Sequence, residues 1–225
     1  MNDTFEERLE SVERRISAAC KKAGRDRDSV RLLAVSKTKP PEAVREAAAC
    51  GLRLFGENRI QEAQSKIQLC PSGLEWHLIG HLQTNKAKVA ARLFQMVHSV
   101  DSLKLLEALD SHAATPLPVL LQVNVSGESA KFGMKPDEVA EVVEAANRMG
   151  KCEVHGLMTI PPFAPDPEKT RVHFRALRAL RDRLQQTTGT PLPELSMGMS
   201  HDLEVAIEEG STWVRIGTDL FGTRG

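Results

Sequence analysis

Residues 31–50 read RLLAVSKTKPPEAVREAAAC, a short apolar run followed by a helical pattern. The apolar run stops at Ser36, and a polar segment with Lys37 and two prolines leads into the helical residues 41–50. A run of four or five apolar residues bounded by polar and proline residues is typical of a buried strand. We interpret this stretch as one strand followed by one helix.

The same unit recurs along the whole chain. Apolar, partly β-branched runs predict strands at residues 31–36, 52–56, 75–80, 96–100, 119–125, 154–160, 194–197 and 212–217. Helical patterns lie between them at residues 41–50, 61–69, 85–94, 102–113, 136–149, 168–187 and 201–209. Within the fifth of these helices, Pro136 suits the first helical position and Gly150 suits the end. Strands that alternate with helices predict a parallel sheet with crossover helices.

An extra helix is expected before the first strand. Thr4 and Glu7 have the spacing of a capping box, and apolar residues with helical period follow them. Gly225 comes only a few residues after the last predicted strand, so no eighth crossover helix is expected there and the N-terminal helix should cover the gap. We therefore predict an α/β fold in which residues 1–225 form one domain, a single closed (β/α)8 TIM barrel. An open doubly wound sheet is the alternative, but no glycine-rich dinucleotide motif follows the first strand.

Composition excludes several classes of protein. The 30 basic and 30 acidic residues cancel, so no basic excess favours nucleic acid or an anionic membrane. No stretch approaches the roughly 20 apolar residues that cross a bilayer, and the first residues are polar and acidic, unlike a signal peptide. These features predict a cytoplasmic protein.

Neither the cysteines nor the histidines predict a metal site. The four cysteines are widely spaced without a CxxC pair, so we expect reduced thiols that pack as small hydrophobic groups. His77 and His81 are four residues apart but lie at a strand end, not in the helical HExxH arrangement.

The predicted active face of such a barrel is the rim formed by the C-terminal ends of its strands. Lys37 follows the first strand directly, which gives it a dry stem and an accessible amine. Burial disfavours an ammonium ion, so the pKa of such a lysine can fall from about 10.4 toward neutrality and leave an amine that condenses with an aldehyde. A lysine that merely extends to solvent at a strand end is the structural alternative.

Two loops are candidates for phosphate binding, because such barrels often hold phosphate after strands seven and eight. Residues 196–202 connect the seventh strand to a helix that Ser200 would cap, and Gly217 would allow a close backbone approach. By alternation, Arg215 shares one face of the eighth strand with Trp213 and Gly217, and Val214 and Ile216 take the other face. An arginine near a barrel mouth needs an anion or an aromatic nitrogen as partner, or it forms an internal ion pair with Glu57 or another carboxylate.

Several motifs in these segments resemble a known family. They are AVSKTKP at 34–40, FGEN at 55–58, WHLIG at 76–80, LQTNK at 82–86, GLM at 156–158, LSMGMS at 195–200 and VRIGT at 214–218. In this order they are similar to the pyridoxal phosphate homeostasis proteins of the YggS and PROSC type. The resemblance implies a barrel of the alanine racemase N-terminal-domain type that binds pyridoxal 5'-phosphate as an imine of Lys37.

The resemblance also implies the other cofactor contacts. The expected roles are phosphate contacts from Ser200, Gly217, Thr218 and the Met199 backbone, Arg215 at the pyridine nitrogen, and Asn58 near the ring. One position departs from the family, because Arg59 stands where a tyrosine is common after Gly-Glu-Asn. This departure affects a contact at the ring edge and not the imine.

The resemblance implies a non-catalytic protein of intracellular pyridoxal phosphate homeostasis, which indirectly affects amino-acid and keto-acid metabolism. Its partners would be the cofactor and pyridoxal phosphate-dependent apo-enzymes, and the protein would be a monomer or weak dimer. The first alternative is an amino-acid racemase, but the chain contains no tyrosine to act as the second base, and His81 is the nearest substitute. The second alternative is an imine-forming aldolase or lyase that acts on a phosphorylated substrate.

Overall fold

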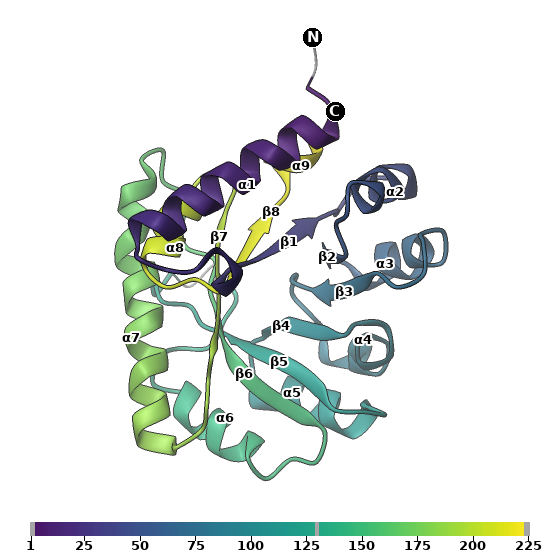
Figure 1. The fold of residues 1–225 in the computed structure, drawn as a ribbon. Coiled ribbons are helices and arrows are strands. Elements are labelled where there is room, and N and C mark those ends of the chain that lie inside the picture. Colours follow the sequence, from purple (N-terminus) through teal and green to yellow (C-terminus); the bar gives the residue numbers. More distant parts are fainter. Residues whose placement is uncertain (1–2, 129–130, 223–225) are drawn as a thin grey trace.

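The computed structural model describes residues 3–128 and 131–222. Its strands form one closed barrel in which each strand is parallel to the next and β8 pairs with β1 (Figure 1). The strands are β1 (Arg31–Val35), β2 (Leu54–Glu57), β3 (Glu75–Leu78), β4 (Met96–Val100), β5 (Leu117–Gln122), β6 (Cys152–Met158), β7 (Glu194–Met199) and β8 (Trp213–Ile216). The predicted (β/α)8 barrel is confirmed.

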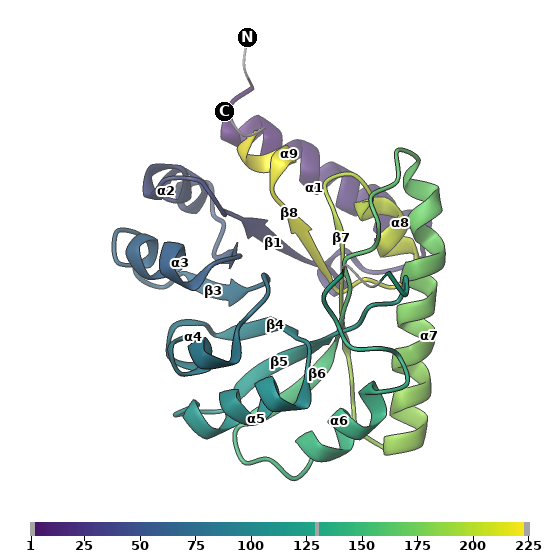
Figure 2. The ribbon, with the colours of Figure 1, turned by 180° about the vertical axis from the view of Figure 1, so that it is seen from behind.

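The helices lie outside the strands (Figures 1 and 2). They are α1 (Phe5–Lys22), α2 (Pro41–Ala49), α3 (Ile60–Ile67), α4 (Ala87–Leu93), α5 (Leu103–His112), α6 (Val139–Ala146), α7 (Arg171–Thr188), α8 (Leu203–Glu208) and α9 (Thr218–Phe221). Three short 3-10 helices are η1 (Arg27–Ser29), η2 (Thr84–Lys86) and η3 (Pro167–Thr170). Over the described ranges, no helix has the length and apolar character that crossing a bilayer requires.

The N-terminal helix covers the outside of the barrel next to β8, as expected. The capping box predicted for Thr4 and Glu7 is present at the start of α1. Both views show α1 beside α8 and α9 (Figures 1 and 2). Arg15 of α1 joins these helices, because its guanidinium pairs with Glu204 on α8 and with Asp219 on α9. Since α9 is only four residues long, α1 takes the place of an eighth crossover helix.

Several predicted helix starts are wrong. The helices expected from residues 85 and 168 begin later, as α4 at Ala87 and α7 at Arg171, because the 3-10 helices η2 and η3 come before them. Residues 136–138 form a turn, because Glu138 N–H donates to the Lys135 carbonyl and closes a tighter i to i+3 bond, so α6 begins at Val139. Ser200 does not cap the helix after β7. Asp202 precedes that helix, and its carboxylate accepts from Met199 N–H at 2.7 Å, which turns the chain before α8 begins.

The core has an inner and an outer part. Inside the barrel, apolar side chains pack together from Leu33, Val35, Ile79, Met96, Leu120, Met158 and Trp213. The larger outer part lies between the strands and the helices and includes Val214 and Ile216. The alternation predicted for β8 is therefore confirmed, with Trp213 and Arg215 on the inner face. This arrangement places polar side chains that follow each strand around one rim of the barrel.

Candidate functional site

A cavity of about 260 Å³ opens at the C-terminal ends of the strands. It brings together all seven residues that the sequence predicted for the site: Lys37, Asn58, Met199, Ser200, Arg215, Gly217 and Thr218. The other residues that line it are Val35, Ile79, Ile160 and His201. The cavity therefore combines one lysine, one arginine, two hydroxyl side chains and an apolar wall.

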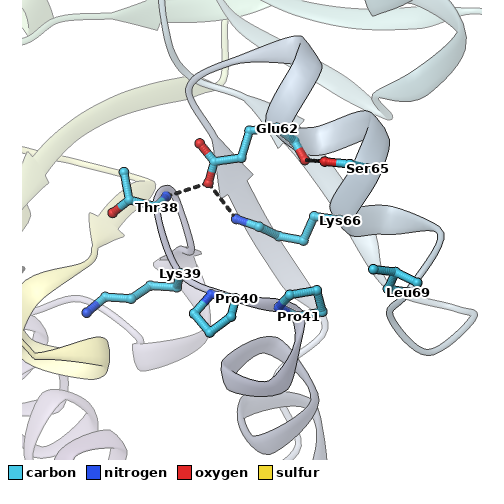
Figure 3. Close-up of a pocket in the computed structure, with 8 residues that line it drawn as sticks. All are labelled: Thr38, Lys39, Pro40, Pro41, Glu62, Ser65, Lys66 and Leu69. Carbon is cyan, nitrogen blue, oxygen red and sulfur yellow. Dashed lines mark hydrogen bonds and ion pairs between the residues drawn. The ribbon is translucent and has the colours of Figure 1, made fainter.

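Lys37 is half-buried and follows β1 after one residue, Ser36, in a loop with an unusual backbone. Thr38 has φ 63°, and among the described residues it is the one non-glycine residue with a positive φ. A left-handed backbone costs about 1–2 kcal/mol in an L-residue, so other contacts must hold it. The Thr38 N–H donates to the Glu62 carboxylate on α3, which provides one such contact (Figure 3).

A buried ion-pair cluster, which we call the clamp, stands behind the Lys37 loop and consists of Glu57, Glu62 and Lys66. Lys66 is 4% exposed, and its Nζ donates to Glu57 Oε1 at 2.6 Å and to Glu62 Oε1 at 2.8 Å. The same Nζ donates to the Ser36 carbonyl at 2.7 Å, immediately before Lys37. Figure 3 shows how Glu62 joins Lys66 to Thr38. The clamp thus ties α3 to the backbone on both sides of Lys37.

Glu57 is fully buried and belongs to the clamp, not to the cavity. Its Oε1 accepts from the Ser36 hydroxyl at 2.7 Å, and its Oε2 has no hydrogen-bond partner. Burial raises the pKa of Glu57, although hydrogen bonds from Lys66 and Ser36 act in the opposite direction. The suggested ion pair between Glu57 and Arg215 is wrong, because Glu57 points outward to α3 and pairs with Lys66.

A second hollow, of about 480 Å³, lies on the outer surface beside the clamp (Figure 3). Its walls come from Thr38, Lys39, Pro40, Pro41, Glu62, Ser65, Lys66 and Leu69. The charged groups in this wall bond to the protein itself, since Lys39 Nζ donates to the Phe221 carbonyl at 2.8 Å and Lys66 and Glu62 bond to each other. We therefore interpret this hollow as part of the structure that supports the Lys37 loop.

Arg215 is 3% exposed and is held by two hydrogen bonds. Its Nη1 donates to Ser196 Oγ at 2.7 Å, and its Nη2 donates to the Thr159 carbonyl at 2.9 Å. Burial lowers the pKa of Arg215 to about 10, so the guanidinium keeps its charge at neutral pH. The cavity therefore contains a fixed cation whose nitrogen atoms can only donate.

The predicted phosphate-binding residues lie together where β7 and β8 end. Ser200 Oγ accepts from Asp219 N–H at 3.3 Å, which links the two loops. Met199 N–H is already used inside the protein, because it donates to Asp202. An added Cβ at Gly217 would meet Val35 at 3.5 Å, an ordinary contact, so the packing of the protein itself does not require glycine there. Gly217 and Val35 both line the cavity.

His201 is the histidine that lines the cavity, and sequence reasoning missed it. Its Nε2 donates to the Ala164 carbonyl at 2.9 Å, and its ring lies 5.3 Å from the ring of Phe163, so it joins the β7–α8 loop to the proline-rich loop after β6. The expectation that His81 is the nearest histidine is wrong, because His81 bonds to Asp101 and is not a lining residue. No pattern in the sequence placed His201 there, since it depends on the turn before α8.

Two apolar lining residues could have been found from the sequence. Val35 and Ile79 occupy inward positions at strand ends, which alternation along β1 and β3 defines. Within residues 3–128 and 131–222, no three side chains of His, Cys, Asp or Glu are grouped so that they could hold a metal ion. All four cysteines are free thiols, and burial raises the pKa of Cys152 to about 12.

Comparison with known proteins places this fold in one class. The family model for the N-terminal domain of alanine racemase matches residues 8–225. Alanine racemase from Corynebacterium glutamicum has the same fold, with a TM-score of 0.71 and 19% identity over 96% of this chain and 61% of that chain. The class is therefore the alanine racemase N-terminal-domain barrel.

Curated relatives identify the family more narrowly. The pyridoxal phosphate homeostasis protein of Aquifex aeolicus is 49% identical over 97% of each chain, and that of Pseudomonas aeruginosa is 48% identical over 98% of this chain and 96% of its own. The chain belongs to the pyridoxal phosphate homeostasis protein family. PipY of Synechococcus elongatus, in a structure with pyridoxal phosphate bound, has a TM-score of 0.84 and 38% identity over 97% of this chain and all of its own.

Proposed function

We propose that this protein binds pyridoxal 5'-phosphate at the rim cavity, holds it through the Lys37 amine, and serves intracellular homeostasis of the cofactor without catalysing a reaction. The main observation in support of the proposal is that one cavity of about 260 Å³ is lined by Lys37, by Arg215 and by the hydroxyl residues Ser200 and Thr218. The relatives at 49% and 48% identity are named as homeostasis proteins, and PipY is described with pyridoxal phosphate bound.

The residues present fit the cofactor. When bound, pyridoxal phosphate supplies an aldehyde that condenses reversibly with a primary amine and releases water. Lys37 supplies the amine, and the clamp keeps the backbone on both sides of it in place. Ser200 and Thr218 offer hydroxyl groups on the side where we place the phosphate, and Asn58 lines the cavity where the ring would lie.

Arg215 explains why binding need not lead to catalysis. A guanidinium can only donate hydrogen bonds, so a ring nitrogen that faces it must accept and stay unprotonated. An unprotonated ring withdraws electrons less effectively from a bound amino acid. The chain also contains no tyrosine for the opposite face of the ring. These features favour storage and delivery of the cofactor over racemisation, and we include pyridoxal phosphate-dependent apo-enzymes as recipients in the proposal.

Borohydride trapping tests the role of Lys37. The purified protein should absorb in the near-ultraviolet to visible range, and reduction followed by peptide mapping should place the cofactor on Lys37. Lys37→Ala should lose this label, whereas Lys39→Ala, two residues away and bonded to the Phe221 carbonyl, should keep it. A label on any other lysine would contradict the proposal, and rapid exchange of amino-acid α-protons by the holo-protein would favour the racemase alternative.

The phosphate side has its own test. Ser200→Ala combined with Thr218→Val should weaken cofactor binding by roughly ten-fold or more, because each hydrogen bond to a charged group contributes about 1.5–3 kcal/mol. Ser65→Ala combined with Thr187→Val removes the same groups from α3 and α7 and should leave binding unchanged. Equal cofactor affinities of the two double variants would show that the phosphate does not bind at these loops.

A further inference from the structure

A line of hydrogen-bonded side chains runs through the inside of the barrel from Glu75 to Arg215. Glu75 Oε1 lies 2.8 Å from His77 Nε2, and His77 Nδ1 lies 3.0 Å from His98 Nε2. His98 Nδ1 lies 2.9 Å from Ser196 Oγ, which in turn accepts from Arg215 Nη1 at 2.7 Å. We call these five residues the barrel chain. It connects β3, β4, β7 and β8 and ends at the cofactor cavity.

The two ends of the barrel chain determine which atom donates in each of its hydrogen bonds. The hydrogen bond from His77 lowers the pKa of Glu75, so this carboxylate is ionised and can only accept. His77 must therefore carry a proton on Nε2. At the other end the Arg215 guanidinium can only donate, so Ser196 must use a lone pair to accept from it.

The middle of the barrel chain then has one neutral arrangement. A His77 ring that carries its single proton on Nε2 accepts at Nδ1, and His98 must then donate from its own Nε2. His98 Nδ1 is left with a lone pair and accepts the hydroxyl proton of Ser196. Complete burial lowers the pKa of His98 well below its usual value, which keeps this ring neutral. Each interior side chain thus donates once and accepts once, and every donor points toward Glu75.

We propose that Glu75, His77, His98 and Ser196 are positioning residues that orient Arg215 toward the ring nitrogen of the bound cofactor. The role in binding rests on the proposed function. Because Ser196 commits its proton to His98, it presents only a lone pair to Arg215. This lone pair and the Thr159 carbonyl fix the plane of the guanidinium, which lines the cavity.

The side chains packed around the barrel chain favour this arrangement of its protons. The Trp213 ring packs edge-on against His77 and His98, with centroid distances of 5.0 and 5.6 Å. The Arg31 guanidinium carbon lies 4.1 Å from the centroid of the Trp213 ring, and Arg31 pairs with Glu194, so its charge is already matched. The inner side chains of β4, β5 and β6 next to the chain are the apolar Met96, Leu120 and Met158.

Glu75 allows the proposal to be tested far from the cofactor. It stands at the start of β3, at the end of the barrel opposite the cavity, and its side chain is 48% exposed. Glu75→Leu therefore removes the terminal acceptor without a buried gap or a change in the cavity wall. Glu153 is a matched control, because it is 53% exposed and pairs with His155 at the same two-residue spacing on β6, outside the barrel chain.

Nitrogen-15 NMR of the histidine rings in the cofactor-free protein measures the proton order directly. Wild-type protein and Glu153→Leu should show His77 and His98 neutral with the proton on Nε2. Glu75→Leu should lose this pattern, with a share of both rings protonated on Nδ1, and Glu75→Gln should restore most of it because its amide oxygen still accepts. An unchanged pattern in Glu75→Leu would overturn the proposed proton order.

Cofactor titration measures the consequence for binding. Glu75→Leu should raise the dissociation constant about five-fold, the effect of losing one well-placed hydrogen bond, and should shift the absorbance of the bound cofactor, while Glu153→Leu should change neither. Altered histidine protonation with unchanged affinity and spectrum would overturn the positioning role. If the wild-type protein had the ordered rings but bound no cofactor, the proposed function would fail while the proton order would stand.

Discussion

Replacement of Lys66 by methionine tests how much the clamp contributes to stability. Methionine nearly matches the volume of lysine, so the variant removes the charge and three hydrogen bonds but leaves little empty space. It leaves Glu57 buried, with one oxygen already lacking a partner. Breaking a buried ion pair on one side costs about 3–5 kcal/mol, and we expect the free energy of unfolding at neutral pH to fall by that amount.

The loss of stability in Lys66→Met should increase as pH rises. Burial raises the pKa of Glu57 in the folded protein, and the bond from Lys66 opposes that rise. Without Lys66 the pKa of Glu57 rises further. A carboxyl group with a raised folded pKa does not destabilise the protein below its unfolded pKa, about 4.3 for glutamate, and destabilises it progressively as pH rises through the folded pKa. The difference between Lys66→Met and wild type should therefore be larger at about pH 7.5 than at about pH 4.5.

Urea unfolding followed by the fluorescence of Trp76 and Trp213, each 3% exposed, measures this difference. Lys88→Met, an exposed change on α4, is the control and should stay within about 0.5 kcal/mol of wild type. The double variant Lys66→Met with Glu57→Met should recover much of the loss, because it removes the unpaired charge as well. A loss below about 1 kcal/mol that does not grow with pH would refute the reasoning, since that is the range of a surface ion pair.

Two further variants separate stability from binding. Gly217→Ala should change the free energy of unfolding by less than about 0.5 kcal/mol, because the new Cβ would stand 3.5 Å from Val35. The same variant should weaken cofactor binding about ten-fold in a titration, because the added methyl group narrows the cavity. Unchanged binding would show that the cofactor binds elsewhere. Thr38→Pro cannot adopt φ 63° and loses the N–H that bonds to Glu62, so urea unfolding should show a loss of stability above about 1 kcal/mol. Thr38→Gly should stay within about 1 kcal/mol of wild type. Equal stability of the two variants would show that the left-handed loop is not required.

The rim residues were predictable because a parallel barrel brings all C-terminal strand ends to one edge. Lys37, Arg215 and Thr218 are each next to an apolar run, and the structure brings them to one cavity. Their individual contacts with the cofactor stay predictions. The beginning of α8 was not predictable, because it depends on the bond between Asp202 and Met199 N–H. Ser200 has the residue type of a helix cap, but the fold turns its hydroxyl to Asp219.

The clamp and the barrel chain could not be found from local pattern. Lys66 has the sequence context of a surface helix residue, yet it reaches the Ser36 carbonyl 30 residues earlier. His98 meets Ser196, 98 residues later, across the closed barrel. Alternation assigns a side chain to the inner face but does not say which inner residue of another strand it contacts.

The amino-acid sequence by itself determined the order of strands and helices, the closed barrel that this order favours, and the reactive groups at the strand ends, because these depend on hydrophobic period and on residues adjacent along the chain. Only the tertiary structure decided which groups share a hydrogen bond, which carboxylate is buried, and which histidine lines the cavity. Barrel closure and helix packing bring distant segments within 3 Å, and at that range burial and the direction of each donor determine charge and proton position.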